Sequence, residues 1–241
     1  MFEKLYHFRF ELFLSSQVAI LFGSLLVPPV IFESYLEPIL FLVNLFAGVI
    51  LISKNPILMW FCIGLLTLNT VLFGISTTLG NESRGISLLP RDSLPSVESR
   101  GISLLRLSGY FLFYIVVTIQ IIKQVWFAKW VNKNVIFGLT SGYISLGLIG
   151  FFIFLTIELV MPGSFQGGVL GIQGANELLT DELMYFSYIT LMTIGYGDIL
   201  PSTVLAQKAT MFVGLIGQFY LVIITAVVVE KYISHNKLGP K

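Results

Sequence analysis

The residues best suited to chemistry stand together in one short segment, Thr193–Asp198, which reads TIGYGD. Glycine adopts backbone angles that are closed to other residues. Gly195 and Gly197 therefore allow successive carbonyls to point the same way, whereas they alternate in an ordinary strand. The hydroxyl of Thr193 adds one more oxygen below them. Several such segments around one axis would form rings of oxygen that replace the hydration shell of a cation.

The segment that precedes this TIGYGD run is too short to cross a membrane. As a helix, Asp181–Met192 covers about 18 Å, which is roughly half of a bilayer core. Asn176, Thr180 and Asp181 are residue types that favour a helix N-terminus. The carbonyl end of such a helix carries a partial negative charge that favours a cation. Non-helical backbone follows at membrane depth, where it is tolerated only inside protein or facing water. The pattern predicts a re-entrant helix that delivers a cation-binding segment.

The composition indicates a membrane protein. The chain has 241 residues, of which 56% are hydrophobic and only 11% are charged, against roughly 25% charged residues in soluble domains. A spanning helix needs about 20 mostly apolar residues. The stretches that meet this rule are Leu14–Phe32, Leu36–Ser53, Ile57–Leu79, Gly109–Phe127, Val135–Met161 and Thr203–Tyr232. We expect an all-α membrane protein of six transmembrane helices, with the re-entrant helix and the TIGYGD run between the fifth and the sixth.

Lysine and arginine predict the orientation of these spans, because basic residues concentrate in cytoplasmic loops. Lys54 lies between the second and third spans, and basic residues also flank both chain ends. Both termini are therefore expected in the cytoplasm. The loop Gly80–Ser108 disagrees, since it carries four arginines on the expected outer side. That loop also holds the octapeptide ESRGISLL twice, at 82–89 and 98–105, which suggests a duplicated, mobile linker.

Several other classes of function find no support in the residues. The net charge of +1 comes without a basic patch that would indicate a nucleic-acid partner. The one cysteine, Cys62, excludes an intrachain disulfide and a multi-cysteine metal site. Paired carboxylates, a nucleophile with a base and a phosphate loop are all missing from the sequence. We therefore expect neither enzyme activity nor a cofactor.

The segment Glu182–Lys231, with the TIGYGD run inside it, resembles the filter region of tetrameric potassium channels of the six-segment, pore-loop type. The resemblance implies a homotetramer in the plasma membrane that conducts K⁺ passively and has membrane lipid and its own copies as partners. It implies that the filter residues are Thr193, Ile194, Gly195, Tyr196 and Gly197. Of these, the K⁺ ligands would be Thr193, Ile194, Gly195 and Tyr196.

Four residues outside the filter are expected to support it. Tyr185 and Phe186 stand where the family usually has two tryptophans, so the resemblance implies an aromatic cuff, with plain packing as the alternative. It also implies that Asp198 accepts a hydrogen bond from the first of these aromatic residues. Glu158, near the outer end of the fifth span, is an intramembrane acid that is expected to have a partner. We expect that partner to be a backbone amide near the start of the sixth span.

The sixth span is expected to line the inner cavity. Glycine costs about 1 kcal/mol against alanine in a helix, so the pair Gly214 and Gly217 asks for a reason. Close helix packing is the reason expected for Gly214, whereas the resemblance places the bending point at Gly217. The residues that recur at helical spacing and are expected to face the pore are Gln218, Leu221, Thr225 and Val229.

These expectations divide the chain into an amphipathic N-terminal segment (1–13), a four-helix domain (14–134), a pore domain (135–232) and a short cytoplasmic tail (233–241). The fourth span, Gly109–Phe127, contains no arginine, so we expect a channel without a conventional charged voltage sensor. A regulator on a separate chain stays open as a partner. Two other functions also stay open: a non-conducting or accessory channel subunit, and a K⁺ transporter subunit.

Overall fold

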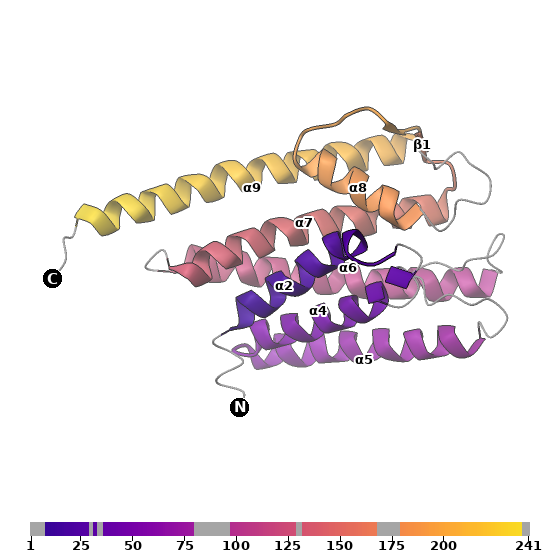
Figure 1. Cartoon of the computed structure of the whole chain (residues 1–241), viewed down its shortest axis with the longest axis horizontal. Helices are drawn as coiled ribbons and strands as arrows, with labels where there is room; N and C mark the ends of the chain where they lie inside the picture. The colour runs from indigo at the N-terminus through magenta and orange to yellow at the C-terminus, as the bar shows by residue number, and fades with distance from the viewer. Residues whose placement is uncertain are drawn as a thin grey trace.

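The computed structural model describes residues 8–28, 31–32, 36–79, 97–128, 132–167 and 179–237. Most of these residues are helical. The elements are α2 (Arg9–Phe22), the 3-10 turn η1 (Gly23–Leu25), α4 (Glu37–Ile52), α5 (Pro56–Leu79), α6 (Val97–Trp126), α7 (Lys133–Val160), β1 (Phe165–Gly167), α8 (Leu179–Leu191), β2 (Ile199–Pro201) and α9 (Val204–Lys237). Helix α7 lies at the centre: α8 and α9 pack on one side of it, and α2 and α6 pack on the other (Figure 1).

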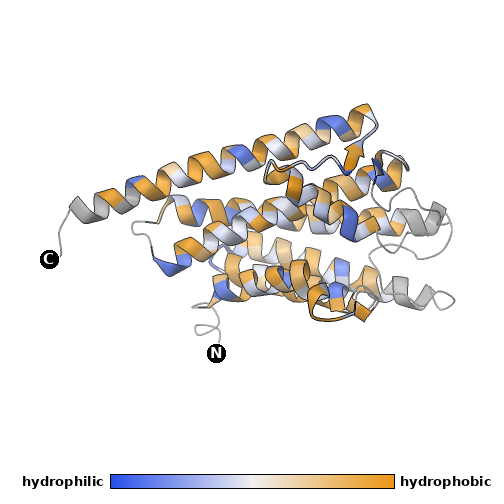
Figure 2. Cartoon of the chain, turned by 45° about the horizontal axis from the view of Figure 1, so that its top comes forward, coloured by the Kyte–Doolittle hydropathy of each residue, from blue (hydrophilic) through white to orange (hydrophobic). Residues whose placement is uncertain are grey.

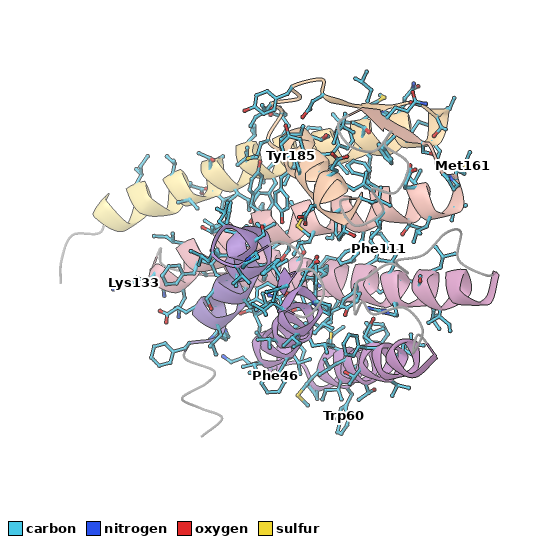
Figure 3. The ribbon with its side chains drawn as sticks, turned by 45° about the vertical axis from the view of Figure 1, so that its right-hand side comes forward. Phe46, Trp60, Phe111, Lys133, Met161 and Tyr185 are labelled. Atoms are coloured by element: carbon cyan, nitrogen blue, oxygen red, sulfur yellow. The ribbon has the colours of Figure 1, made fainter. Side chains whose placement is uncertain are left out.

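Four helices are long and apolar enough to cross a membrane by length and composition. Their candidate spans are Pro56–Gly74, Gly101–Trp126, Lys133–Val160 and Val204–Glu230. Hydrophobic residues cover these helices on outward as well as packed surfaces (Figure 2). Trp60 in α5, for example, points away from the bundle (Figure 3) and is 68% exposed, and Phe46 in the shorter helix α4 is 52% exposed. Such a surface suits lipid, so the helices indicate a membrane protein.

The first expected span, Leu14–Phe32, is not one continuous helix. Helix α2 ends at Phe22, and a 3-10 turn follows at Gly23–Leu25. A Cβ added at Gly23 would lie 2.2 Å from the ring of Phe32, so the chain folds back over this glycine. Helix α4 is apolar but has only 16 residues. The expected six full-length spans are therefore met by four helices of spanning length and two shorter ones within the part of the chain that the structure describes.

Helix α6 begins twelve residues earlier than the sequence analysis placed it, at Val97 instead of Gly109. The second copy of the octapeptide thus lies entirely within α6, whereas the first lies outside the described residues. Ser103, Arg106, Leu107 and Tyr110 are all buried and follow one another at helical spacing. This stripe escapes a search for apolar residues because serine and arginine occupy two of its positions. The expected span Gly109–Phe127 contains no arginine, but α6 extends beyond it and includes Arg106. Arg106 is 4% exposed, and its guanidinium carbon lies 5.8 Å from the ring centroid of Phe73.

Aromatic rings form the core between α4, α6 and α7. Tyr110 stacks on Phe152 with ring centroids 5.6 Å apart, and Phe41 packs against both. All three side chains are almost completely buried. This cluster joins the four-helix region to the central helix α7.

Buried polar side chains add hydrogen bonds to this contact. The hydroxyl of Tyr114 donates to Oδ1 of Asn44 at 2.5 Å, and Nδ2 of Asn44 donates to Oγ of Ser16 at 2.8 Å. Nε2 of Gln17 donates to Oγ of Ser145 at 2.7 Å. Because water is absent from a bilayer core, such groups stabilise the bundle only when they bond to one another. The last of these bonds connects α2 directly to α7.

A two-stranded antiparallel sheet departs from the all-helical expectation. Strand β1 pairs with β2 in the register Phe165↔Pro201 to Gly167↔Ile199. Each strand has three residues, which is too short for an alternating pattern to be recognised in the sequence. The sheet ties the turn after α7 to the residues that lead into α9, and so fixes the far end of the TIGYGD run.

Candidate functional site

Side-chain hydroxyls that donate to backbone carbonyls hold α8 against α7. Oγ of Ser187 donates to Gly147 O at 2.6 Å, and the hydroxyl of Tyr188 donates to Ile144 O at 2.7 Å. A Cβ added at Gly147 would lie 2.2 Å from the ring of Tyr188, so glycine permits the close approach. Helix α8 has 13 residues, about 20 Å. The short helix expected before the TIGYGD run is thus present, while the proposed cap residue Asn176 lies outside the described residues.

The TIGYGD run starts as an extension of α8 that is bonded to its last turn. Backbone N–H groups of Thr193, Ile194 and Gly195 donate to carbonyls of α8: Thr193 to Thr190 O at 3.0 Å, Ile194 and Gly195 to Ile189 O at 2.9 and 3.3 Å. In a trans peptide the carbonyl points opposite to the N–H of the same unit, and no described peptide bond is cis. The carbonyls of Thr193 and Ile194 therefore both point away from α8.

The backbone angles along the run alternate in sign. Residues Thr193, Gly195 and Gly197 have φ of +58°, +54° and +84°, and the two residues between them are not in this region. Thr193 is the one non-glycine residue with positive φ in the described part of the chain. That conformation costs an L-residue roughly 1–2 kcal/mol, so the surrounding structure imposes it. Strain of this kind concentrates at binding sites.

Asp198 ends the run and is bonded on two sides. The hydroxyl of Tyr185 donates to Oδ2 of Asp198 at 2.7 Å, and the N–H of Ile199 donates to Oδ1 at 3.1 Å. The hydrogen bond expected between Tyr185 and Asp198 is therefore formed. It raises the pKa of Tyr185 to about 12, because the bond requires the protonated phenol. Tyr185 is labelled on α8 in Figure 3. The contact connects α8 to the residue that leads into β2.

Phe186 points the other way, into the protein. It is 4% exposed, whereas Tyr185 is 40% exposed. Its ring lies 5.1 Å from that of Phe154 in α7 and 5.5 Å from that of Phe165 in β1, between centroids. The two adjacent aromatic residues thus have different contacts: Tyr185 bonds to the run, and Phe186 packs α8 against α7 and the sheet.

Glu158 does not bond where the sequence analysis expected. Its carboxylate accepts hydrogen bonds from the N–H groups of Gly163 at 2.6 Å and Phe165 at 3.1 Å. Both partners are backbone amides, but they belong to the turn directly after α7 and not to the start of α9. The turn folds back over the end of its own helix, which brings these amides closer than any later segment. Ser164 O then accepts from the N–H of Ser202, so the link to α9 is indirect.

The two glycines of α9 differ in how closely they pack against α8 within one chain. A Cβ at Gly217 would lie 2.3 Å from Leu191 O, the carbonyl at the end of α8. A Cβ at Gly214 would lie 3.8 Å from Thr190 O, which is an ordinary contact. The closely packed glycine is therefore Gly217, and assigning that role to Gly214 was wrong.

Helix α9 buries one face and leaves the other open. Val213, Gly217 and Tyr220 are buried, and the hydroxyl of Tyr220 donates to Leu139 O of α7 at 2.7 Å. The residues that were expected to face a pore are all exposed in the single chain: Gln218, Leu221, Thr225 and Val229. The TIGYGD run is exposed as well, and Tyr196 is 70% exposed. In one chain, the carbonyls of the TIGYGD run and the open face of α9 therefore both lie on the surface.

Sequence reasoning missed the residues that position α8. Besides Ser187 and Tyr188 these include Tyr143, whose hydroxyl donates to Leu191 O at 3.3 Å. One signal was available, because α7 is rich in small residues, which mark close helix contacts in membranes; Gly147 and Gly150 are the two that contact α8, at Tyr188 and Ser187. The small residues of α7 include Gly138, Gly142, Ser145, Gly147 and Gly150. No group of three metal-ligating side chains occurs among the described residues.

The comparison with known families places the same segment in a functional class. Residues 171–234 match a family model described as "Ion channel". The match covers α8, the TIGYGD run and most of α9. No curated protein and no solved structure matches the chain. The family match and the apolar helices together support an ion channel in a membrane.

Proposed function

We propose that this chain forms a potassium-selective channel that conducts K⁺ passively, as a homotetramer in the plasma membrane with both termini in the cytoplasm. The observation that carries the proposal is the backbone of the TIGYGD run. Two successive carbonyls, those of Thr193 and Ile194, point away from α8, and the alternating φ at Thr193, Gly195 and Gly197 extends this arrangement. A column of carbonyl oxygens can replace the hydration shell of K⁺.

The proposed ligands of K⁺ are the oxygens of Thr193, Ile194, Gly195 and Tyr196, with Gly197 completing the filter. The carbonyl end of α8 lies at the start of the column and adds a partial negative charge. Tyr185–Asp198 holds the outer end of the column. Phe186 and Glu158 support the filter indirectly. Phe186 packs against Phe165 of the sheet, and Glu158 holds the turn after α7.

A homotetramer is proposed because one chain supplies one column, and a ring of ligands needs several. Closed symmetric rings are the usual form of homo-oligomers. The open face of α9 and the exposed run would then surround the axis. In this assembly Gln218, Leu221 and Thr225 line the cavity. Movement of α9 at Gly217, with Gly214 one turn before it, opens or closes that cavity.

The proposal includes only weak voltage dependence. Arg106 is the one arginine in the candidate span Gly101–Trp126 of α6. A voltage sensor carries roughly three to four gating charges per subunit. One arginine supplies at most about one of these gating charges.

The test is K⁺ flux into liposomes that contain the purified protein, with Na⁺ as the competing ion. Gly195→Ala is the test variant and Gly163→Ala is its matched control. Both glycines have positive φ, +54° and +81°, and a Cβ at either position meets nothing within 4 Å. Both substitutions therefore carry a similar local strain, but Gly163 lies in the turn after α7, outside the run.

We expect flux that prefers K⁺, that Gly195→Ala abolishes and that Gly163→Ala largely retains. Equal Na⁺ and K⁺ flux would overturn the selectivity. Loss of flux in both variants would show that strain, and not the filter, explains the effect. Silence of the unmodified protein under every ion gradient would favour an accessory subunit or a transporter subunit instead.

A further inference from the structure

A cavity of about 130 Å³ lies away from the TIGYGD run, where three helix ends meet. It is lined by the first turn of α2, the last turn of α6 and the first turn of α7, which lie at the same end of the bundle (Figure 1). The share of one water in liquid volume is about 30 Å³, so the cavity holds a group larger than a single water. Under the proposed orientation this end faces the cytoplasm.

The polar groups of this cavity are suited to an anion. Arg9 supplies a guanidinium, and Asn132 and Asn134 supply side-chain amides. Gln124 turns its Oε1 toward Arg9 and donates its NH₂ to Leu51 O at 3.4 Å. The Oδ1 of Asn132 accepts from the N–H of Val135 at 3.0 Å, so its NH₂ is the group left to donate. The eight lining residues that belong to the described part of the chain include no acidic side chain. The N-terminal end of α7 adds a partial positive charge.

One hydrogen bond of Arg9 to another lining residue is long. Its Nη2 donates to Oε1 of Gln124 at 3.4 Å, beyond the usual 2.7–3.2 Å for this type of bond. Its guanidinium carbon lies 4.8 Å from the ring centroid of Phe10, within cation–π distance. An anionic oxygen would form a shorter, charge-assisted bond. The planar fork of a guanidinium matches two oxygens of a phosphate.

We propose that this cavity binds a phosphate group. The chemistry is that of a lipid headgroup phosphate or of a free phosphate, since both offer the same oxygens to Arg9 and the amides. Occupancy would connect α2 to α7 at the point where Phe10 and Val125 already pack against Gly138; a Cβ there would lie 3.1 and 3.2 Å from them. The ligand therefore sits between the four-helix region and the helix that carries α8 and α9.

Binding is measured on the intact protein in detergent by native mass spectrometry and by thermal stabilisation. The probes are inorganic phosphate, dihexanoyl phosphatidic acid and dihexanoylglycerol, which lacks phosphate. Arg9→Gln is the test variant. Lys123→Gln is the matched control, because Lys123 is an exposed cation next to Gln124 that does not line the cavity.

We expect Arg9→Gln to weaken binding of phosphatidic acid roughly tenfold or more, as for a lost charged hydrogen bond, and Lys123→Gln to change it less than about threefold. Arg9→Lys, which keeps the charge but not the fork, should fall between them. Where Arg9→Gln fails to fold, Asn134→Leu tests the same cavity through an amide. Equal effects of Arg9→Gln and Lys123→Gln, or equal binding of dihexanoylglycerol, would overturn the proposal.

The probes also identify the source of the phosphate. Inorganic phosphate that binds as tightly as phosphatidic acid supports a free phosphate, whereas tight binding of the lipid alone supports a headgroup. Neither measurement uses ion flux, so failure here leaves the proposed channel function untouched.

Discussion

The contact between Gly217 and the end of α8 can be tested by a matched pair of substitutions. In Gly217→Ala the new Cβ meets Leu191 O at 2.3 Å, and ordinary contact begins near 3.4 Å. The two helices must therefore separate by about 1 Å at this point. Leu191 O is a backbone atom that also accepts from Tyr143, so it has little freedom to turn aside. Overpacking of this kind costs about 1–3 kcal/mol.

Gly214→Ala is the control, because its Cβ would find ordinary contact at 3.8 Å. Both substitutions gain roughly 1 kcal/mol of helix propensity. The difference between the two variants therefore isolates the contact at Gly217. We expect Gly214→Ala to be as stable as the unmodified protein or up to about 1 kcal/mol more stable. Gly217→Ala should be about 1–3 kcal/mol less stable than Gly214→Ala.

The assay is unfolding in detergent, followed by circular dichroism, with K⁺ flux measured on the same preparations. Flux should fall in Gly217→Ala, because the displaced carbonyl belongs to the end of α8, where the TIGYGD run starts. Equal stability of the two variants would refute the reasoning. A larger loss in Gly214→Ala would refute it more strongly, since it would restore the packing role to that glycine.

Three further predictions follow from other contacts. The bond to Asp198 raises the pKa of Tyr185 from the ordinary 10 to about 12, so the stabilisation from this bond is complete below pH 10 and is lost as the pH rises through 12. The difference in melting temperature between the unmodified protein and Tyr185→Phe should therefore vanish over that range. A difference that stays constant would contradict the bond. Ser145→Ala leaves the buried Nε2 of Gln17 without its acceptor and should cost about 1–2 kcal/mol in detergent unfolding, part of which Gln17→Leu restores; a single variant as stable as the parent would refute this. Arg106 is the one arginine of its span, so each chain moves at most about one charge, or roughly 2.3 kcal/mol per 100 mV. Planar-bilayer recordings should therefore give a shallow voltage dependence, which Arg106→Gln should flatten. A slope that needs three charges per chain would disprove this prediction.

Local features of the structure were predicted correctly from the sequence. The positions of α4, α5, α7 and α9 follow from continuous apolar stretches, and each begins or ends within a few residues of the expected bounds. The short helix before the TIGYGD run also follows from local pattern. These features depend on neighbours in the chain, so a sequence contains what is needed to predict them.

Features that depend on how the chain folds back or on which side chains its neighbours bury were mispredicted. Helix α6 extends back to Val97 because the polar residues Ser103 and Arg106 are buried by neighbouring helices, which an apolar count does not register. Glu158 bonds to its own turn because that turn folds back, and Leu14–Phe32 divides because Phe32 covers Gly23.

The sequence by itself determined that this is an apolar chain with one segment, TIGYGD, whose glycines permit aligned carbonyls. Only the tertiary structure decided how that segment is held. Ile189 O and Thr190 O anchor its start, Tyr185 bonds to its end, and Gly217 lets α9 reach Leu191. The physical reason is that residue types set which backbone angles are open, whereas packing across the bundle selects one of them and supplies the bonds that offset its strain.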